Sequence, residues 1–462
     1  MKRIILSSLI TWYSRSDRKP LLLRGARQVG KTWLVRELAR QLKLTLVEVN
    51  FELQPEAKAA FHSLRPAEIL KALALLGFPP VEPGSGLLLL DEIQACPQAI
   101  VALRYFYETR PDLAVIGTGS LLEFAMEAEA FSMPVGRIEF LWLQPMNFVE
   151  YLQARGNHAL ADAVSQFTPA QGIWPEIAHR QALTELRNYL FCGGMPQALQ
   201  AMAEGNDPEA CRRAQLSILQ SYRQDFYKYA GKVKAALAEQ LFLRAPGLVG
   251  GRFKFSHIDG EARSAELKPA VRALEKAGVI RRVYHSSGQG LPLATDCNER
   301  LAKLFMLDVG LMHAALRIDA QLVQEPDLLA IHRGAVAEQF VAQELLASAP
   351  PDRESELYFW AREALNSQAE VDFLIPSGSK VLPVEVKSGA TGTLKSLHSF
   401  LDSHPASPQG LRLYTGMPMT TGRIVHLPLY LACAAHQLLV TGSGEPVPDG
   451  TPQPASRTDA TE

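Results

Sequence analysis

Apolar runs and helix-like periodicities alternate along the first 120 residues. The apolar segment LLLRG follows Pro20, and it is succeeded by the polar stretch ARQVG, the helical pattern KTWLVRELARQL and the strand-like LTLVEVN. Two strand-like runs, residues 87–93 and 113–120, begin with the fully apolar stretches LLLL and LAVIG and are separated by a helical pattern that ends at Pro111. Fully apolar strands that alternate with helices are typical of a parallel sheet covered on both faces. The pattern therefore predicts an α/β block over residues 1–150.

The texture of the chain changes after residue 152. Long helical patterns come first, and they are followed by short helices with a Gly/Pro-punctuated hairpin that resembles a winged helix-turn-helix. A helix near Gly334 then opens a second α/β pattern, and the last residues are rich in Pro, Gly, Ser and Thr. After the first block we expect a helical region, a winged-helix-like domain, a second α/β domain and a disordered tail, over residues 151–234, 235–325, 326–441 and 442–462.

Composition narrows the function classes. Among 462 residues, 47 Lys and Arg face 48 Asp and Glu, so the net charge of −1 gives no global attraction to nucleic acid or acidic membranes. The five cysteines show no CxxC spacing, which fits a reducing compartment and predicts neither a disulfide nor a cysteine metal site. No apolar run approaches the roughly 20 residues of a membrane-spanning helix, and no signal-peptide cleavage site follows the start. We expect a cytoplasmic protein with no membrane partner.

A phosphate-binding pattern stands between the first strand and the first long helix. It reads GxxxxGK[ST], and its strand–loop–helix context is the one in which this pattern binds nucleotides. In such a loop the backbone N–H groups surround the β- and γ-phosphates, the lysine bridges them, and the hydroxyl after it binds Mg²⁺. The predicted ATP-binding residues are Gly25, Ala26, Arg27, Gln28, Val29, Gly30, Lys31 and Thr32.

The second apolar run ends in two acids, Asp91 and Glu92. Because ligands bind at the carboxyl ends of parallel strands, Asp91 is predicted to hold Mg²⁺ beside Thr32. Glu92 is predicted to polarise the attacking water as the general base, and Lys31 completes the catalytic set. The plainer reading, two acids ending a buried strand at a solvated loop, is less favoured by this position.

Two further candidates are less specific. The third strand ends in GTGS, so Thr118 or Ser120 is a candidate sensor of the γ-phosphate, although a plain strand-to-helix turn has the same sequence. Arg137 is a candidate to stabilise transition-state charge in cis or across a subunit interface. A surface arginine capping a loop remains open for it.

These motifs occur in one order with others along the chain: LLLDEIQ, GR with LQPMNFVEYL, GGMP, LDVGL, FW, EVDF and VEVKSG. That series resembles the bacterial and archaeal AAA-type ATPases that carry a C-terminal domain of unknown function. The resemblance implies a cytoplasmic ATP-binding protein with an AAA-type P-loop module and a restriction-endonuclease-like, PD-(D/E)xK, C-terminal fold. One departure is Val309, where these proteins usually have Thr, which puts a polar role at that position in doubt.

The last α/β pattern contains the D…ExK arrangement of nucleases. Glu385 and Lys387 alternate on one strand and so share a face, and Asp372 is expected on the neighbouring strand. Two carboxylates for Mg²⁺ and a lysine to activate water suit phosphodiester cleavage, and Glu338 on the preceding helix is a candidate third carboxylate. A silent remnant of such a site, or a surface Glu–Lys pair, stays open as the alternative.

The predicted function is an ATPase that couples its nucleotide state to a DNA-associated, nuclease-like domain, with ATP and Mg²⁺ as cofactors. A basic stripe of Lys268, Arg272 and Lys276 suits DNA phosphates, but Glu266 and Glu275 flank it. The alternative is a nucleotide-dependent switch that binds a protein partner with a silent C-terminal fold. A scaffold that binds ATP with negligible turnover, and assembly into a homo-oligomer, also stay open.

Overall fold

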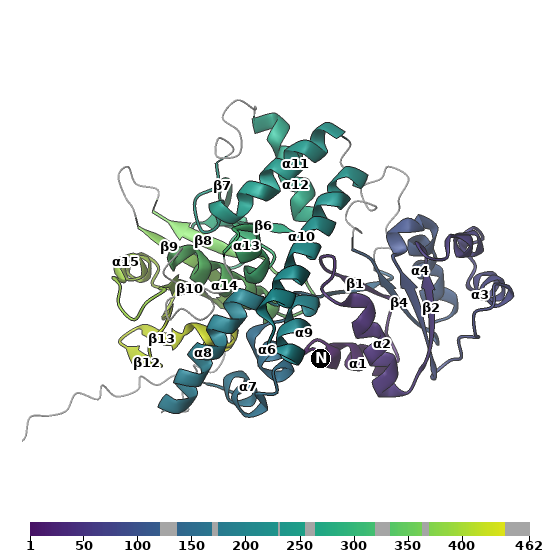
Figure 1. The fold of residues 1–462 in the computed structure, drawn as a ribbon, viewed down its shortest axis with the longest axis horizontal. Coiled ribbons are helices and arrows are strands. Elements are labelled where there is room, and N and C mark those ends of the chain that lie inside the picture. The colour runs from purple at the N-terminus through teal and green to yellow at the C-terminus, as the bar shows by residue number, and fades with distance from the viewer. Residues whose placement is uncertain are drawn as a thin grey trace, which may run out of the picture.

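The computed structural model describes residues 1–120, 136–168, 174–229, 232–254, 264–318, 333–362 and 369–438. Figure 1 shows an N-terminal α/β block in purple and blue at one side, helices in the middle, and a C-terminal sheet in green and yellow at the other side. The expected tail, residues 442–462, lies outside the described residues. None of the helices in the described ranges combines the length and apolar composition that crossing a bilayer requires.

The N-terminal block is built on a five-stranded, wholly parallel sheet, as the sequence predicts. Its strand order is β2-β3-β4-β1-β5. The edge strand β5 is the one member that the apolar pattern did not indicate. The elements are α1 (Leu6–Ser14), β1 (Leu21–Arg24), α2 (Lys31–Leu42), β2 (Thr45–Asn50), η1 (Pro55–Phe61), α3 (Pro66–Leu75), β3 (Gly86–Asp91), η2 (Ile93–Ala95), α4 (Pro97–Thr109), β4 (Ala114–Thr118) and β5 (Glu139–Trp142).

The central strands of this sheet are buried on both faces. Leu21 and Leu23 of β1 belong to one apolar cluster, whereas Leu22 between them belongs to the cluster on the other side. The same alternation holds along β3, where Leu87 and Leu89 face one side and Leu88 and Leu90 the other. Because successive side chains of a strand point to opposite faces, continuous leucine runs are what a sheet covered twice requires.

Helices connect the first block to the second sheet, as the sequence predicts for the middle of the chain. Pro196 and Pro208 occupy the first positions of α9 and α10, where a missing N–H costs no helical hydrogen bond. The helices are α6 (Phe148–Ala154), α7 (His158–Ser165), α8 (Glu176–Cys192), α9 (Pro196–Gly205), α10 (Pro208–Tyr229), α11 (Lys232–Arg244), η4 (Ala245–Leu248) and α12 (Ser264–Lys276).

The C-terminal sheet is mixed and eight-stranded, with the order β12-β13-β11-β10-β9-β8-β6-β7. Strands β10, β11 and β13 run parallel, whereas β9 is antiparallel to both β8 and β10. Its elements are β6 (Ile280–Ser286), η6 (Leu293–Asp296), β7 (Cys297–Met306), α13 (Val309–Ala315), α14 (Arg333–Ala347), β8 (Tyr358–Ala361), β9 (Glu370–Ser377), β10 (Lys380–Val386), α15 (Lys395–Ser403), β11 (Gly410–Tyr414), β12 (Met419–Thr421), β13 (Ile424–Pro428) and η9 (Leu429–Gln437).

The hairpin expected as a separate wing belongs to this C-terminal sheet. Strands β6 and β7 pair antiparallel, and β6 also pairs in parallel with β8 through Tyr284 and His285. The sheet therefore continues across the boundary that the sequence suggested at residue 325. One continuous apolar cluster runs from α1 and α2 through the middle helices to β11 and β13, so the two sheets are joined by a shared core.

Candidate functional site

The predicted P-loop connects the carboxyl end of β1 to the start of α2. Gly25, Gln28 and Gly30 have positive φ angles of 141°, 63° and 96°, which curl the backbone. A Cβ at Gly25 would lie 2.3 Å from the carbonyl oxygen of Leu143, so only glycine fits there. The loop thus has the curled form that turns backbone N–H groups toward a phosphate at a helix N-terminus.

The Lys31 ammonium lies across this loop. Its Nζ donates hydrogen bonds to the carbonyl oxygens of Gly25 (2.9 Å) and Ala26 (2.8 Å). Burial lowers the pKa of Lys31 to about 8, although the negative charges of Glu92 and Asp91 oppose the shift. A buried cation held by neutral carbonyl groups is well placed to pair with phosphate oxygens.

Asp91 is held by donors from the ends of two neighbouring strands and from the P-loop helix. The Thr32 hydroxyl lies 3.2 Å from both carboxylate oxygens, Asn50 Nδ2 donates at 3.0 Å, and the buried Thr118 hydroxyl also donates to Asp91. The sequence prediction did not include Asn50. Its signal is positional, because Asn50 ends β2 and is paired in register with Asp91 of β3.

We expect Thr118→Val to slow ATP turnover by about 10-fold or more while nucleotide binding persists. Valine preserves the shape but removes a hydrogen bond to a charged group, worth about 1.5–3 kcal/mol. Thr184→Val, which removes an exposed helix hydroxyl on α8, is the matched control. Steady-state turnover and analogue binding measure both variants, and unchanged turnover in Thr118→Val would show that this contact is only structural.

Glu92 follows directly at the strand edge. Its φ of +49° is unusual for a non-glycine residue, and Gln94 Nε2 donates to Glu92 Oε2 at 2.5 Å. Strain of this kind gathers at functional sites because the surrounding structure must enforce it. The carboxylate is partly exposed beside Lys31 and Asp91, which suits the predicted general base.

The two remaining nucleotide-site candidates separate. Ser120 is buried and lines a cavity of about 220 Å³ together with Gly25 and Ala26. Arg137 instead precedes the amino end of β5, where its Nε pairs with Glu108 Oε1 at 3.1 Å. The topology does not support the predicted cis role of Arg137, because the P-loop lies at the carboxyl ends of the strands; a role across a subunit interface stays a prediction.

Residues outside the motif buttress the P-loop. The Arg27 guanidinium pairs with Asp225 of α10, and the Tyr222 hydroxyl donates to the Arg27 carbonyl at 2.8 Å. A Cβ on Gly278, in the turn between α12 and β6, would lie 3.1 Å from the Cβ of Ala26. The loop is therefore covered by the middle helices and by the turn that leads into the C-terminal sheet.

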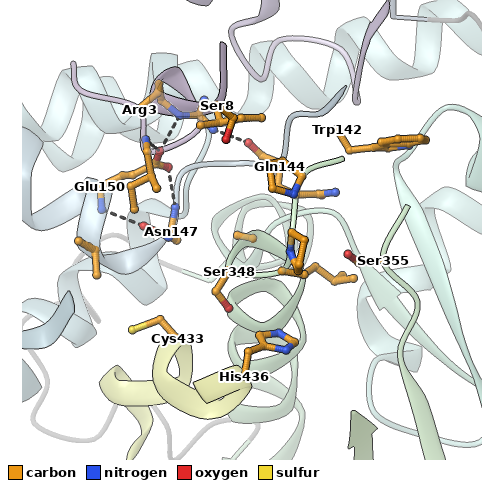
Figure 2. Close-up of a pocket in the computed structure, with 18 of the residues that line it drawn as sticks. Arg3, Ser8, Trp142, Gln144, Asn147, Glu150, Ser348, Ser355, Cys433 and His436 are labelled. Atoms are coloured by element: carbon orange, nitrogen blue, oxygen red, sulfur yellow. Dashed lines mark hydrogen bonds and ion pairs between the residues drawn. The ribbon is translucent and has the colours of Figure 1, made fainter. Parts of the chain in front are cut away.

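The N-terminal segment contacts the loop from another side, through Arg3, which Figure 2 shows beside Glu150, Gln144 and Asn147. The buried Arg3 donates to the Val29 carbonyl at 2.8 Å, to Glu150 Oε1 at 3.0 Å and to the Gln144 carbonyl at 2.6 Å. Asn147 closes the network, because its backbone N–H donates to Glu150 Oε2 at 3.1 Å. This network borders a cavity of about 460 Å³ that reaches α14 and η9.

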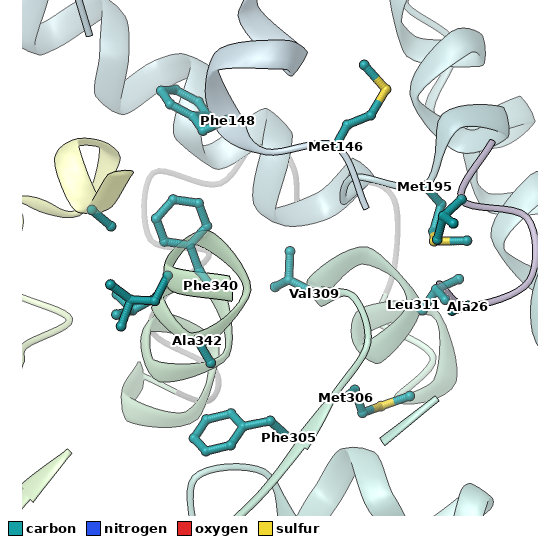
Figure 3. Packing of buried hydrophobic residues seen from close by; sticks show 14 of the residues in the cluster. Ala26, Met146, Phe148, Met195, Phe305, Met306, Val309, Leu311, Phe340 and Ala342 are labelled. Atoms are coloured by element: carbon teal, nitrogen blue, oxygen red, sulfur yellow. The ribbon is translucent and has the colours of Figure 1, made fainter. Parts of the chain in front are cut away.

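The GGMP, LQPMNF and LDVGL segments meet at one junction. The Gly194 N–H donates to Asp308 Oδ2 at 2.6 Å, and the Met146 N–H donates to the Gly194 carbonyl at 2.8 Å. Val309 is buried, and its N–H donates to Gln343 Oε1 at 2.9 Å, so this position contributes an apolar side chain and a backbone donor. Figure 3 shows this part of the core, which also contains Ala26 of the P-loop.

Glu344 of α14 ties the first block to the second. Its Oε1 accepts the Phe148 N–H at 2.8 Å, and its Oε2 has no hydrogen-bond partner among the described residues. Burial raises the pKa of Glu344 to about 8. Between the ordinary pKa and pH 8 the unfolded chain has released a proton that the folded chain retains, so stability falls as pH rises through this window.

We therefore expect Glu344→Gln to flatten the pH dependence of stability. Glutamine keeps an acceptor for the Phe148 N–H and cannot ionise. From pH 5 to pH 8 the urea midpoint of the wild type should fall relative to that of the variant. The corresponding loss in free energy of unfolding is on the order of 1.4 kcal/mol for each unit of pKa shift. Parallel midpoints over this range would contradict the assignment.

Two of the C-terminal candidate acids contact a lysine that the sequence prediction did not place there. Asp372 lies on β9, Glu385 on β10 and Glu338 on α14, and the buried Lys303 of β7 contacts two of them. Lys303 Nζ lies 3.1 Å from Asp372 Oδ1 and 3.3 Å from Glu338 Oε2, and 2.8 Å from Glu370 Oε1. The sequence prediction contained neither Lys303 nor Glu370 in this cluster.

The predicted catalytic lysine pairs with its glutamate. Lys387 Nζ lies 2.6 Å from Glu385 Oε1, and the Val386 N–H donates to Asp372 Oδ2 at 2.9 Å. Burial and the neighbouring Asp372 raise the pKa of Glu385 to about 7. Across the described ranges, no group of three or more His, Cys, Asp or Glu residues is arranged to hold a metal ion. The metal role of Glu338, Asp372 and Glu385 thus stays a prediction.

Three segments of the chain match known families. Residues 17–152 match an AAA domain, residues 183–322 a domain of unknown function (DUF8612), and residues 333–430 a domain of unknown function (DUF4143). A search of curated protein sequences found no match.

Solved structures with similarity include the Walker-type ATPase PABY2304 of Pyrococcus abyssi, at 15% identity and a TM-score of 0.44, covering 68% of this chain and 95% of that one. The Aeropyrum pernix ORC2 protein, in ADPNP–ADP complexes, is 14% identical with a TM-score of 0.35, and the match covers 69% of this chain and 94% of that one. The Thermotoga maritima RuvB Holliday junction branch migration motor is 15% identical with a TM-score of 0.26, and the match covers 61% of this chain and 90% of that one. These scores are too low to carry information on activity.

The AAA match and the local geometry agree on the first block. The matched segment contains the curled loop, Lys31, the Thr32–Asp91 contact and the strand-end Glu92. Its sheet is parallel, with the loop at the carboxyl end of a central strand. Residues 17–152 therefore match an AAA domain in sequence and have the P-loop geometry of a nucleotide-binding site.

Proposed function

We propose that this protein hydrolyses MgATP at the P-loop and couples its nucleotide state to a DNA-associated, nuclease-like C-terminal domain. The observation that carries the ATPase part is the contact of Thr32 with Asp91, because it brings a hydroxyl and a carboxylate together beside the loop. Oxygen ligands of these two kinds fit Mg²⁺. When bound, Mg²⁺ supplies positive charge that neutralises the phosphate oxygens.

The residues of the chain divide the remaining work. The curled backbone and Lys31 bind the β- and γ-phosphates, and Asn50 and Thr118 orient Asp91. Glu92 accepts a proton from the attacking water, which its position at the strand edge allows. Ser120 lies close enough to the loop to report on the bound phosphate.

Contacts of the P-loop support the coupling part of the proposal. Pro196, at the start of α9, would lie 3.6 Å from a Cβ at Gly30, and Arg3 holds the Val29 carbonyl. Pro196 immediately follows the GGM turn, whose Gly194 N–H donates a hydrogen bond to Asp308, the residue that caps α13 just after β7. A shift of the loop on nucleotide binding is therefore transmitted by rigid contacts toward the C-terminal sheet.

Two features support the DNA-associated part. The order α14, β8, β9, β10, α15, β11 places Asp372 and Glu385 on adjacent strands, with Lys387 immediately after β10, as in a PD-(D/E)xK nuclease core. Helices α11 and α12 followed by the β6–β7 hairpin have the element order of a winged helix. Lys268 and Arg272 are exposed on α12, where they can contact phosphates.

A second function is favoured by one observation. Lys303 lies within 3.3 Å of three carboxylates, so positive charge is already present where nuclease chemistry needs a metal. A nucleotide-dependent switch that binds a protein partner, with a silent C-terminal fold, follows from that arrangement. Either function is compatible with a homo-oligomer in which one subunit supplies an arginine to the ATP site of its neighbour.

Nuclease assays separate the two functions. We expect the wild type to nick DNA when both Mg²⁺ and ATP are present, and Asp372→Ala, Glu385→Ala and Lys387→Ala to abolish nicking while ATP turnover stays within about two-fold. Asp402→Ala, an exposed acid on α15, is the matched control and should cleave like the wild type. Turnover of ATP without cleavage of any single- or double-stranded DNA would favour the silent switch.

A further inference from the structure

A lysine side chain occupies the centre of the C-terminal acidic site. Lys303 is 1% exposed at its side chain, and its Nζ lies 2.8–3.3 Å from oxygens of Glu370, Asp372 and Glu338. The acids come from β9 and α14, so three carboxylates converge on one cation from two elements. Several carboxylate oxygens around one point are the kind of ligand that a hard divalent cation takes. Here an ammonium group takes that position, and in this arrangement no three acids of the described ranges are placed to hold a metal ion.

The charges of the centre do not balance. Four carboxylates and three cations make up the cluster: Glu338, Glu370, Asp372, Glu385, Lys303, Arg252 and Lys387. When all are ionised, four negative and three positive charges leave a net charge of −1, and burial and the neighbouring Asp372 raise the pKa of Glu338 to about 8 and that of Glu385 to about 7. Without Lys303 the fully ionised cluster carries a net charge of −2, which one divalent cation neutralises. The electrostatics of the site therefore favour a divalent cation once the ammonium is gone.

An unsatisfied oxygen independently points to a ligand. Glu385 is 5% exposed, and its Oε2 has no hydrogen-bond partner among the described residues, although its Oε1 is paired with Lys387. Asp372, on the adjacent strand, has one oxygen on the Val386 N–H and the other on Lys303. A buried carboxylate oxygen without a donor is destabilising unless a cation satisfies it.

We propose that Lys303 is an internal counter-ion that excludes a divalent cation from Glu338, Asp372 and Glu385, so that the nuclease-like centre is autoinhibited by β7. Strand β7 is the edge strand of its sheet. The backbone of Lys303 forms an isolated antiparallel β-bridge with the backbone of Arg252, in the segment that precedes α12. Metal entry requires this strand to withdraw its lysine. The inference rests on the proposed nuclease-like function only for the metal chemistry of the carboxylates.

The test is titration of the full-length chain with Mn²⁺ alone, with free Mn²⁺ followed by electron paramagnetic resonance in the absence of nucleotide and DNA. We expect Lys303→Met and Lys303→Gln to gain one Mn²⁺ per chain with an affinity at least about 10-fold above the wild type, because the competing cation is removed. Lys303→Arg retains the charge and should behave like the wild type. Adding Asp372→Asn to Lys303→Met should abolish the gain.

Three results would overturn the proposal. The first is a wild type that binds Mn²⁺ as tightly as the neutral variants, and the second is a gain that survives Asp372→Asn. The third is failure of both neutral variants to fold with and without Mn²⁺, because Lys303 would then be a structural ion-pair partner and not an exchangeable cation. A chain that gains Mn²⁺ yet never cleaves DNA keeps this inference and loses the proposed nuclease function.

Discussion

Replacing Lys31 by alanine is expected to lower ATP turnover at least about 100-fold. The ammonium is buried at the mouth of the P-loop, 2.8–2.9 Å from two loop carbonyl oxygens, and methyl replacement leaves no positive charge there for the β- and γ-phosphates. Losing one preorganised group that stabilises transition-state charge costs about 10²–10³ in rate. Steady-state release of inorganic phosphate measures the effect.

Lys71→Ala is the matched control for this variant. Lys71 is an exposed lysine on α3 in the same domain, so its replacement removes equal charge far from the loop and should leave turnover unchanged. Thermal unfolding of both variants separates lost chemistry from lost structure. A Lys31→Ala chain that folds like the wild type and retains its turnover would contradict the assigned role.

Gly194→Ala is expected to destabilise the whole chain by about 3 kcal/mol or more. A Cβ at Gly194 would lie 2.0 Å from the carbonyl oxygen of Met146 and 2.9 Å from its nitrogen, and both are backbone atoms that cannot rotate away. The added methyl group would break the Met146–Gly194 hydrogen bond and displace the Gly194 N–H from Asp308. The urea midpoint should fall accordingly.

Gly247→Ala supplies the comparison for the junction. A Cβ at Gly247 meets nothing within 4 Å, so alanine there should leave the urea midpoint nearly unchanged. If Gly194→Ala also unfolds at the wild-type midpoint, the three motif segments are not held together by the close backbone approach that the structure shows.

The sequence predicted best where local pattern and position decide the outcome. The strand–loop–helix around Lys31 is confirmed, as is the parallel sheet, because the leucine runs must be buried on both faces. Asp91 could be placed beside Thr32 because ligands bind at the carboxyl ends of parallel strands. Asn50 was not predicted, because an asparagine at a strand end gives no signal until its register with β3 is known.

Long-range pairing explains the features that escaped prediction. Strand β5 is only four residues long and mostly half-buried, so its alternation is too weak to detect. The hairpin was expected in a winged-helix-like domain over residues 235–325, but a few parallel pairs of β6 with β8 merge β6 and β7 into the C-terminal sheet. Lys303 reaches Asp372 across 69 residues of sequence, a contact that no local pattern can indicate.

Calorimetric titration of the purified chain with a non-hydrolysable ATP analogue, with and without Mg²⁺, tests the central claim most directly. The arrangement of Lys31, Thr32 and Asp91 predicts saturable binding of one nucleotide per chain, strengthened by Mg²⁺ and lost in Lys31→Ala. Absence of saturable binding by a folded wild-type chain in the presence of Mg²⁺ would contradict it.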